Sequence, residues 1–170
     1  EDSRPIIKKL DSIFREFVRS DKLYSDVNIV SFDKDLPIFG ENNSADMVLT
    51  FRNVHNWVAA GTSEDMFKGF YNVLKPGGIL GVVEHQAKSE ISIEDQISSG
   101  YMTEKAVLKL AEENGFEFLG RSDINFNEKD STTHINGVWT LLPNLRGLPE
   151  DKKKDYSSIG ESHRMTLKFV

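Results

Sequence analysis

Apolar residues recur along the chain with two periods, and the two periods predict alternating helices and strands. Residues 4–20 carry apolar side chains at three- and four-residue spacing, which predicts a helix that buries one stripe. The same spacing predicts helices at 62–74 and 103–113. Short apolar or alternating runs predict strands at 26–32, 45–51, 79–84, 116–120 and 165–170. This alternation predicts a doubly wound α/β fold, with helices on both faces of a mostly parallel sheet.

A joint between helix and strand occupies residues 74–78, which read L-K-P-G-G. Lysine in a last helical turn offsets the negative end of the helix dipole, proline ends the helix, and glycine adopts the tight reversal into a strand. Thr103 is expected to cap the next helix, and residues 114–115 (N-G) are expected to end it.

Two segments lack a clear period. Residues 86–102 are polar and predict a loop or an irregular helix over the edge of the sheet. Between 125 and 162, charged stretches flank one short apolar piece, 138–142. Because this long connection replaces a helix, the last two strands are expected to form an antiparallel pair at one edge. The sequence has no internal repeat or linker, so residues 1–170 are expected to form one domain.

Charge and composition exclude several classes of protein. Lys and Arg number 21 and Asp and Glu 27, a net charge of −6, which argues against nucleic acid as a partner. No apolar run approaches the roughly 18 residues of a membrane span, so no membrane partner is expected. The absence of cysteine excludes disulfides, thiolate metal sites and cysteine nucleophiles, and it fits a reducing, cytoplasmic location.

The order of strand, polar tip, helix, L-K-P-G-G and strand resembles the C-terminal two-thirds of class I S-adenosylmethionine-dependent methyltransferases. Residues 53–55 (N-V-H), 83–85 (V-E-H) and 165–169 (M-T-L-K-F) are similar, more narrowly, to a group of bacterial predicted methyltransferases of undefined substrate. The resemblance covers most of residues 26–170. It implies a Rossmann-like sheet with strand order 3-2-1-4-5-7-6 and S-adenosylmethionine as the cofactor.

The start of the chain departs from that family pattern. In such enzymes a glycine-rich loop after strand 1 and an acidic residue ending strand 2 hold the cofactor, and no G-x-G occurs in this chain. Aligned on L-K-P-G-G, residues 26–32 are the third strand, so a truncated domain without its first two strands is expected. Residues 45–51 would then have an open edge through which two copies of the chain could pair. The chain alone is expected to bind the cofactor only at millimolar concentration, and full methyltransferase activity is expected of the complete domain.

Ligands in open α/β sheets lie beyond the carboxyl ends of the strands, so the residues just after each strand are the candidates. By resemblance, Asp33 or Asp35 accepts a hydrogen bond from the adenine amino group, and Asn53 lies on the cofactor side of the next tip. For the two aspartates, a turn carboxylate that stabilises Leu36 and Pro37 is the alternative.

His55 and His85 follow adjacent parallel strands, so both are expected at one pocket. Each imidazole is a candidate general base or substrate-orienting group because imidazole titrates near neutral pH, and a histidine satisfied by a backbone carbonyl is the alternative. Asn56, Trp57 and Glu84 are the expected substrate-binding residues.

The predicted function is methyl transfer to an unidentified, small-molecule acceptor. Methyl transfer depends on alignment and on exclusion of water more than on covalent help, so the sequence does not name the acceptor. A methyltransferase-like fold that has lost catalysis and serves as a binding module is the alternative. No metal is expected: a site with Glu84 or His134 beside the two histidines was weighed, but the spacing matches no ligand motif.

Overall fold

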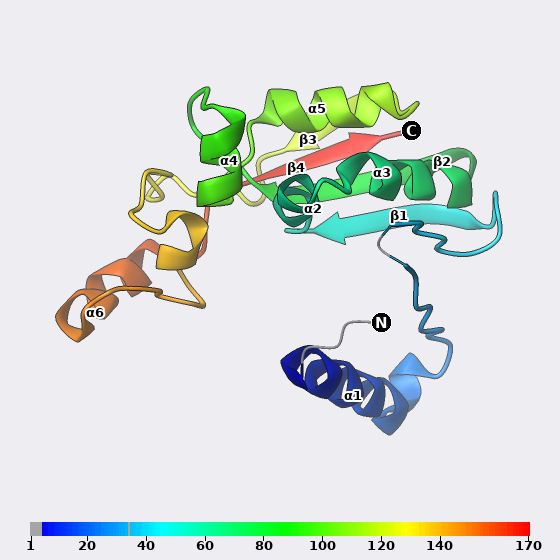
Figure 1. Ribbon diagram of the computed structural model, residues 1–170, viewed down its shortest axis with the longest axis horizontal. Coiled ribbons are helices and arrows are strands. Elements are labelled where there is room, and N and C mark those ends of the chain that lie inside the picture. Colours follow the sequence, from blue (N-terminus) through cyan, green and yellow to red (C-terminus); the bar gives the residue numbers. More distant parts are fainter. Residues whose placement is uncertain (1–4, 34) are drawn as a thin grey trace.

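The computed structural model describes residues 5–33 and 35–170, which form a four-stranded sheet with helices packed on one face (Figure 1). The helices are α1 (Pro5–Ser20), α2 (Val54–Ala60), α3 (Ser63–Val73), α4 (Ile93–Ser99), α5 (Glu104–Glu113) and α6 (Glu150–Ile159), with short 3₁₀ turns η1 (Lys22–Tyr24) and η2 (Gly137–Thr140). The strands are β1 (Ala45–Phe51), β2 (Leu74–His85), β3 (Phe118–Ser122) and β4 (Arg164–Phe169). None of the helices in the described residues is long and apolar enough to cross a membrane.

The sheet has the order β1-β2-β4-β3. β1 and β2 are parallel, and β4 is antiparallel to both of its neighbours. Three strands therefore point in one direction, and the predicted antiparallel pair lies at one edge. This order corresponds to the 4-5-7-6 part of the expected methyltransferase sheet, which confirms the fold class and shows that the sheet is partial.

The L-K-P-G-G joint is more extended than the sequence predicts. β2 begins at Leu74 rather than at residue 79, and its pairing with β1 shifts register between Ala45 and Met47. Gly77, with φ of 79°, takes the backbone conformation that other residues rarely adopt. The tight reversal expected at residues 74–78 is therefore an irregularity in the pairing of β2 with β1, and these residues belong to β2.

The core lies between the sheet and helices α2, α3 and α5, which cover one face in Figure 1. Phe67, Leu80, Val107 and Leu167 are almost fully buried there. Thr103 caps α5 as predicted, because its hydroxyl accepts a hydrogen bond from the backbone N–H of Ala106.

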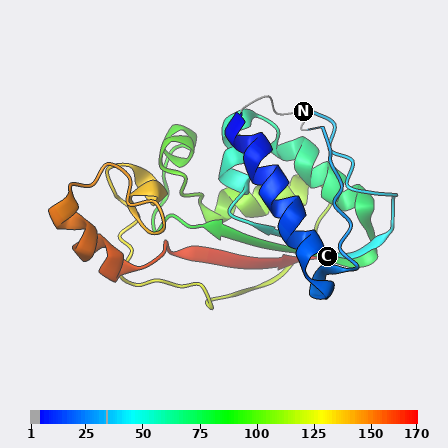
Figure 2. The ribbon, with the colours of Figure 1, turned by 90° about the horizontal axis from the view of Figure 1, so that it is seen from below.

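The expectation of helices on both faces is wrong for the described part of the chain: they pack on one face, and the opposite face and the free edge of the sheet are open. Met47, Leu49 and Phe51 of β1 are each more than half exposed, and β1 has a strand on one side only. The predicted helix α1 forms, but Figure 1 shows it standing off from the sheet, and in Figure 2, seen from below, it crosses in front of the sheet. Its expected buried stripe is wrong: Leu10 and Phe14 are about half exposed. Pairing with a second copy at the open edge stays a prediction.

The predicted strand at 26–32 is wrong. These residues form no ladder with any described strand, and Val27 and Val30 are about half exposed. An alternating pattern becomes a strand only when a partner strand satisfies its backbone groups. The chain is anchored further on, where Phe39 stacks on Phe70 of α3.

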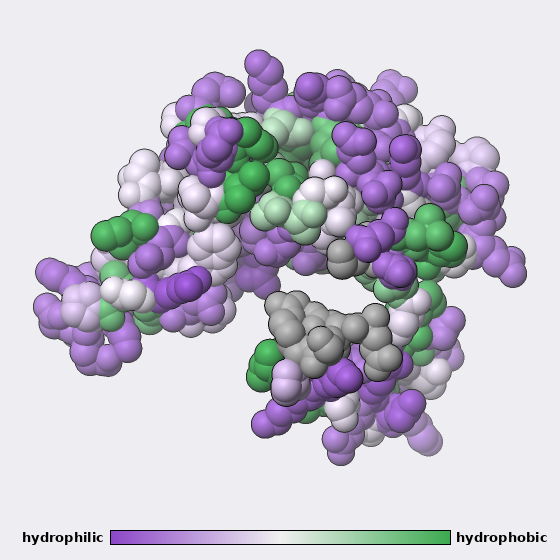
Figure 3. All heavy atoms as spheres, in the orientation of Figure 1, coloured by the Kyte–Doolittle hydropathy of each residue, from purple (hydrophilic) through white to green (hydrophobic). Residues whose placement is uncertain are grey.

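The segment from 123 to 163 extends beyond the carboxyl ends of β1 and β2, where Figure 1 shows it as a lobe carrying η2 and α6. Figure 3 shows the α6 end of this lobe as mostly hydrophilic. Residues 86–102, predicted as loop or irregular helix, contain the short helix α4, whose first turn is capped by the Ser92 hydroxyl. The lobe and α4 together border the carboxyl edge of the sheet.

Candidate functional site

The rings of His55 and His85 meet at the carboxyl edge of the sheet. His55 lies in the first turn of α2, directly after β1, and His85 is the last residue of β2. Their ring centroids are 5.2 Å apart. The predicted convergence of the two rings is therefore confirmed, whereas their catalytic role stays a prediction.

Glu84 orients His55. Its side chain is fully buried, and Oε1 lies 2.9 Å from Nδ1 of the His55 ring. The same carboxylate accepts the backbone N–H groups of His55 at 3.2 Å and of His85 at 2.8 Å. Since a carboxylate only accepts hydrogen bonds, Nδ1 of His55 is the protonated nitrogen and Nε2 keeps a free lone pair. Glu84 therefore contacts the His55 imidazole, and its predicted contact with substrate stays a prediction.

His85 is held in a neutral state. Its Nδ1 is hydrogen-bonded to the hydroxyl of Ser162. Burial lowers the pKa of His85 to about 4; the attraction of Glu84 opposes this shift, and the neighbouring His55, Arg52 and Arg164 reinforce it. At neutral pH the ring is an uncharged hydrogen-bonding group.

Two aromatic side chains flank the histidine pair. The Trp139 ring meets His55 edge-on with centroids 6.2 Å apart, and Tyr101 meets His85 in the same way at 6.3 Å. The sequence analysis did not find either residue as part of the site. η2 carries Trp139 to the site because Gly137 packs directly on the Ser99 carbonyl at the end of α4, where a side chain would not fit.

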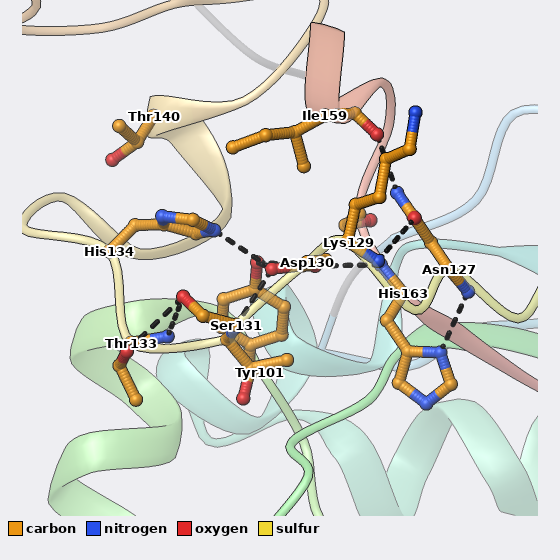
Figure 4. Close-up of polar contacts among 12 residues, drawn as sticks. Tyr101, Asn127, Lys129, Asp130, Ser131, Thr133, His134, Thr140, Ile159 and His163 are labelled. Carbon is orange, nitrogen blue, oxygen red and sulfur yellow. Dashed lines mark hydrogen bonds and ion pairs between the residues drawn. The ribbon is translucent and has the colours of Figure 1, made fainter. Parts of the chain in front are cut away.

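A second cluster, missed entirely by the sequence analysis, is centred on Asp130 (Figure 4). Its fully buried carboxylate accepts hydrogen bonds from the Tyr101 hydroxyl at 2.8 Å and from the His134 ring at 2.8 Å. It also accepts the backbone N–H groups of Thr132 and His163, at 2.8 and 2.7 Å. The only sequence signal was the turn-forming D-S-T-T run.

These donors determine the ionisation of the cluster. Burial by itself raises the pKa of Asp130, but the hydrogen bonds from His163, Thr132, Tyr101 and His134 outweigh it and lower the pKa below its usual value. Burial and the Asp130 charge raise the pKa of Tyr101. Asp130 is therefore a stable anion that joins the lobe to the helices.

Asn127 ties the same lobe to the end of α6. Its side-chain amide donates to the Ile159 carbonyl at 2.9 Å, and its backbone N–H donates to the His163 ring at 3.2 Å. Figure 4 shows His163 and Asp130 within one polar network. Because Ser162 directly precedes His163, this network also fixes the hydroxyl that contacts His85.

The remaining predicted residues lie in more exposed places. Asp33 and Asp35 are in an exposed turn, in which the Asp35 backbone N–H donates to Oδ1 of Asp33 at 3.0 Å, so the turn geometry weighed above is present. Asn53 is exposed and donates to the Thr50 hydroxyl at 3.2 Å. A contact with adenine for Asp33 or Asp35, and a contact with the cofactor for Asn53, stay predictions.

Asn56 and Trp57 follow the histidine on α2. Asn56 is exposed, whereas Trp57 is half-buried and packs on Phe70 with ring centroids 5.6 Å apart. The contact with Phe70 gives Trp57 a role in packing. Substrate contact by either residue stays a prediction.

His55, Glu84 and His85 each offer one ligand atom, and the three atoms lie within 4.8 Å of one another, so this trio has the composition of a metal site. Both Glu84 oxygens already accept N–H groups, which favours a carboxylate–imidazole pair over a ligand set. His134, weighed as another ligand, contacts Asp130 instead.

The neutral state of His85 predicts a specific loss of stability in acid. The unfolded chain takes up a proton near pH 6.5 but the folded chain only near pH 4, so stability falls as the pH drops through this interval, by on the order of 3 kcal/mol. Urea unfolding at pH 7.0 and 4.5 measures the change. In His85→Gln the decrease should be smaller; an equal decrease in both proteins would show that other groups cause it.

Comparison with known proteins identifies the fold. No family profile matches the chain, and no curated protein matches it in sequence. The 4+2 cyclase SpnF superposes with a TM-score of 0.62 at 20% identity, over 93% of this chain and 61% of SpnF. A putative sarcosine dimethylglycine methyltransferase from Galdieria sulphuraria has a TM-score of 0.57 at 15% identity, over 99% of this chain and 67% of that protein.

A third structure, a SAM-dependent methyltransferase from Methanosarcina mazei, has a TM-score of 0.57 at 11% identity, over 93% of this chain and 75% of that protein. The fold is thus that of S-adenosylmethionine-dependent methyltransferases. The chain spans less than two thirds of SpnF, and SpnF is named a cyclase, so the activity has to be argued from the site.

Proposed function

We propose that the protein transfers a methyl group from S-adenosylmethionine to a small-molecule acceptor, with His55 as the general base. The observation that carries the proposal is the buried carboxylate–imidazole pair of Glu84 and His55 at the carboxyl edge of β1 and β2. Ligands of open α/β sheets occupy this edge. We also propose that the protein is related to the bacterial predicted methyltransferases of undefined substrate that its sequence resembles.

The residues present fit one part of the cofactor site. The exposed tip at Asn53 borders the edge where the histidines meet, and the turn at Asp33 and Asp35 is proposed to contact adenine. The chain has no glycine-rich turn for the rest of the cofactor, so its affinity should be millimolar. When bound, S-adenosylmethionine supplies an electrophilic methyl group.

The chain's own residues would prepare the acceptor. Nε2 of His55 would take the proton of an acceptor hydroxyl, and Glu84 would stabilise the resulting imidazolium. Neutral His85 offers a hydrogen bond at the same place. Asn56 and Trp57 are proposed as further acceptor contacts. Trp139 and Tyr101 limit access of water to the two rings.

The test uses the histidine signals of the protein. Titration with S-adenosylhomocysteine up to the high millimolar range, followed by NMR of the His55 and His85 rings, should show saturable shifts. Transfer of a labelled methyl group from millimolar S-adenosylmethionine to a panel of phenols, hydroxy acids and amines should then occur in the wild type and be lost in His55→Gln. Absence of both ring shifts and label transfer would support the alternative, a binding module without catalysis.

A further inference from the structure

An arginine flanks His85 on each of the two neighbouring strands. Arg164 of β4 pairs directly with His85 in the strand register. On the other side Phe51 of β1 pairs with Val83, so Arg52 is the next residue, and its backbone N–H donates to the Val83 carbonyl at 2.7 Å. The positive charges of both arginines act on the His85 ring. The two arginine residues thus lie on either side of the carboxyl end of β2.

Both arginines have hydrogen-bond donors to spare. In the part of the chain that the structure describes, the Arg52 guanidinium has neither a hydrogen bond nor an ion pair, and the residue is exposed. Arg164 uses Nη1 for Glu161 at 2.7 Å, but its Nε is buried and has no partner among the described residues. A buried N–H without an acceptor is costly, so an acceptor that reached this atom would relieve that cost.

The backbone at Arg52 is itself unusual. Its φ of 57° lies in the left-handed region, which a residue with a side chain rarely adopts because Cβ comes close to the following carbonyl oxygen. Such strain collects at functional sites, where the position of a side chain matters. Here the strained residue stands at the tip between β1 and α2, two residues before Val54 and three before the proposed base, His55.

We propose that Arg52 and Arg164 bind a carboxylate of the methyl acceptor, so that the acceptor is a small hydroxy acid; this rests on the methyl-transfer function proposed above. A guanidinium matches the planar carboxylate with two parallel N–H donors. Because the whole protein carries a net charge of −6, an anion would be attracted by these local donors and not by the overall field. The hydroxyl of the acid would then reach His55.

The experiment compares an acid with its uncharged ester on the intact chain. 4-Hydroxybenzoate, lactate and salicylate, and the methyl ester of each, are titrated without S-adenosylmethionine, and the His55 and His85 ring signals report binding. At least one acid should bind roughly 10- to 100-fold more tightly than its ester. Arg52→Gln should remove this difference. Arg164→Lys, which keeps the charge but lacks Nε, should reduce it.

Arg121→Gln is the matched control, since Arg121 lies on β3 and pairs with Glu104. It should bind the acids as the wild type does. Equal binding of every acid and its ester, or an unchanged preference in Arg52→Gln, would overturn the proposal. So would a loss of S-adenosylhomocysteine binding in Arg52→Gln with acid binding intact, because the arginine would then serve the cofactor. Acid binding without label transfer would instead count against methyl transfer alone.

Discussion

Asp130→Asn should lower the free energy of unfolding by about 3 to 5 kcal/mol, because it breaks a buried charged cluster. The Asp130 side chain is fully buried, and its two oxygens accept bonds from the Tyr101 hydroxyl, the His134 ring and two backbone N–H groups. The new amide would place a donor against these donors. Urea unfolding at pH 7 with circular dichroism measures the loss.

Asp155→Asn is the control, because Asp155 is exposed on α6, and it should change stability by no more than about 0.5 kcal/mol. Tyr101→Phe removes one donor and should cost less than Asp130→Asn. Since the folded pKa of Asp130 is lowered, its contribution is present above the usual value of 3.8 and lost as the pH falls below it. Equal stability of Asp130→Asn and wild type at pH 7 would refute the structural role of the cluster.

Glu84→Gln should slow methyl transfer by roughly 10²- to 10⁴-fold, the usual contribution of a general base. The amide of glutamine has no charge to stabilise the imidazolium and can present an N–H to Nδ1 of His55. The rate of S-adenosylhomocysteine formation gives kcat, and ¹⁵N NMR of the His55 ring gives the tautomer. The value of kcat and the tautomer of the His55 ring should change together.

Glu112→Gln is the matched control, because Glu112 is exposed on α5, far along the chain from the histidine pair. It should leave both the rate and the His55 tautomer unchanged. Thermal unfolding of each variant separates a loss of base function from a loss of folded protein. If Glu84→Gln keeps the wild-type rate while its ring tautomer changes, His55 is not the base.

Short-range sequence signals were sufficient to predict the helices and strands that depend on nearby residues alone. The threonine cap at Thr103, the helical spacing of α3 and the short apolar run of β1 each depend on neighbours within a few residues. The segment 26–32 has a clear alternation but no partner strand among the described residues, so its pattern did not produce a strand. A hydrophobic period therefore predicts a helix or a strand correctly only when the fold provides a surface or a partner strand for it to pack against.

The convergence of His55 and His85 also followed from sequence, because equivalent positions after adjacent parallel strands meet at one edge. The contact of Glu84 with His55 did not follow from the sequence. It was placed among the substrate contacts, and only the register of β1 and β2 brings its carboxylate to Nδ1 of His55, 29 residues away. β2 begins five residues earlier than its pattern suggests. The sequence does not reveal which face of the sheet the Glu84 side chain points to, because the pairing of β2 with β1 and β4 sets that face.

By itself, the sequence determined the fold class, helices α1, α3 and α5, the four strands and the meeting of the two histidines, because these follow from periodicity, caps and parallel-strand geometry. The tertiary structure decided the rest. Asp130 receives donors from Tyr101 and His163, 29 and 33 residues away, and Arg164 lies beside His85 only through the β2–β4 register. Such partners carry no local signal, since a buried charge is recognisable only once the donors that stabilise it are in place.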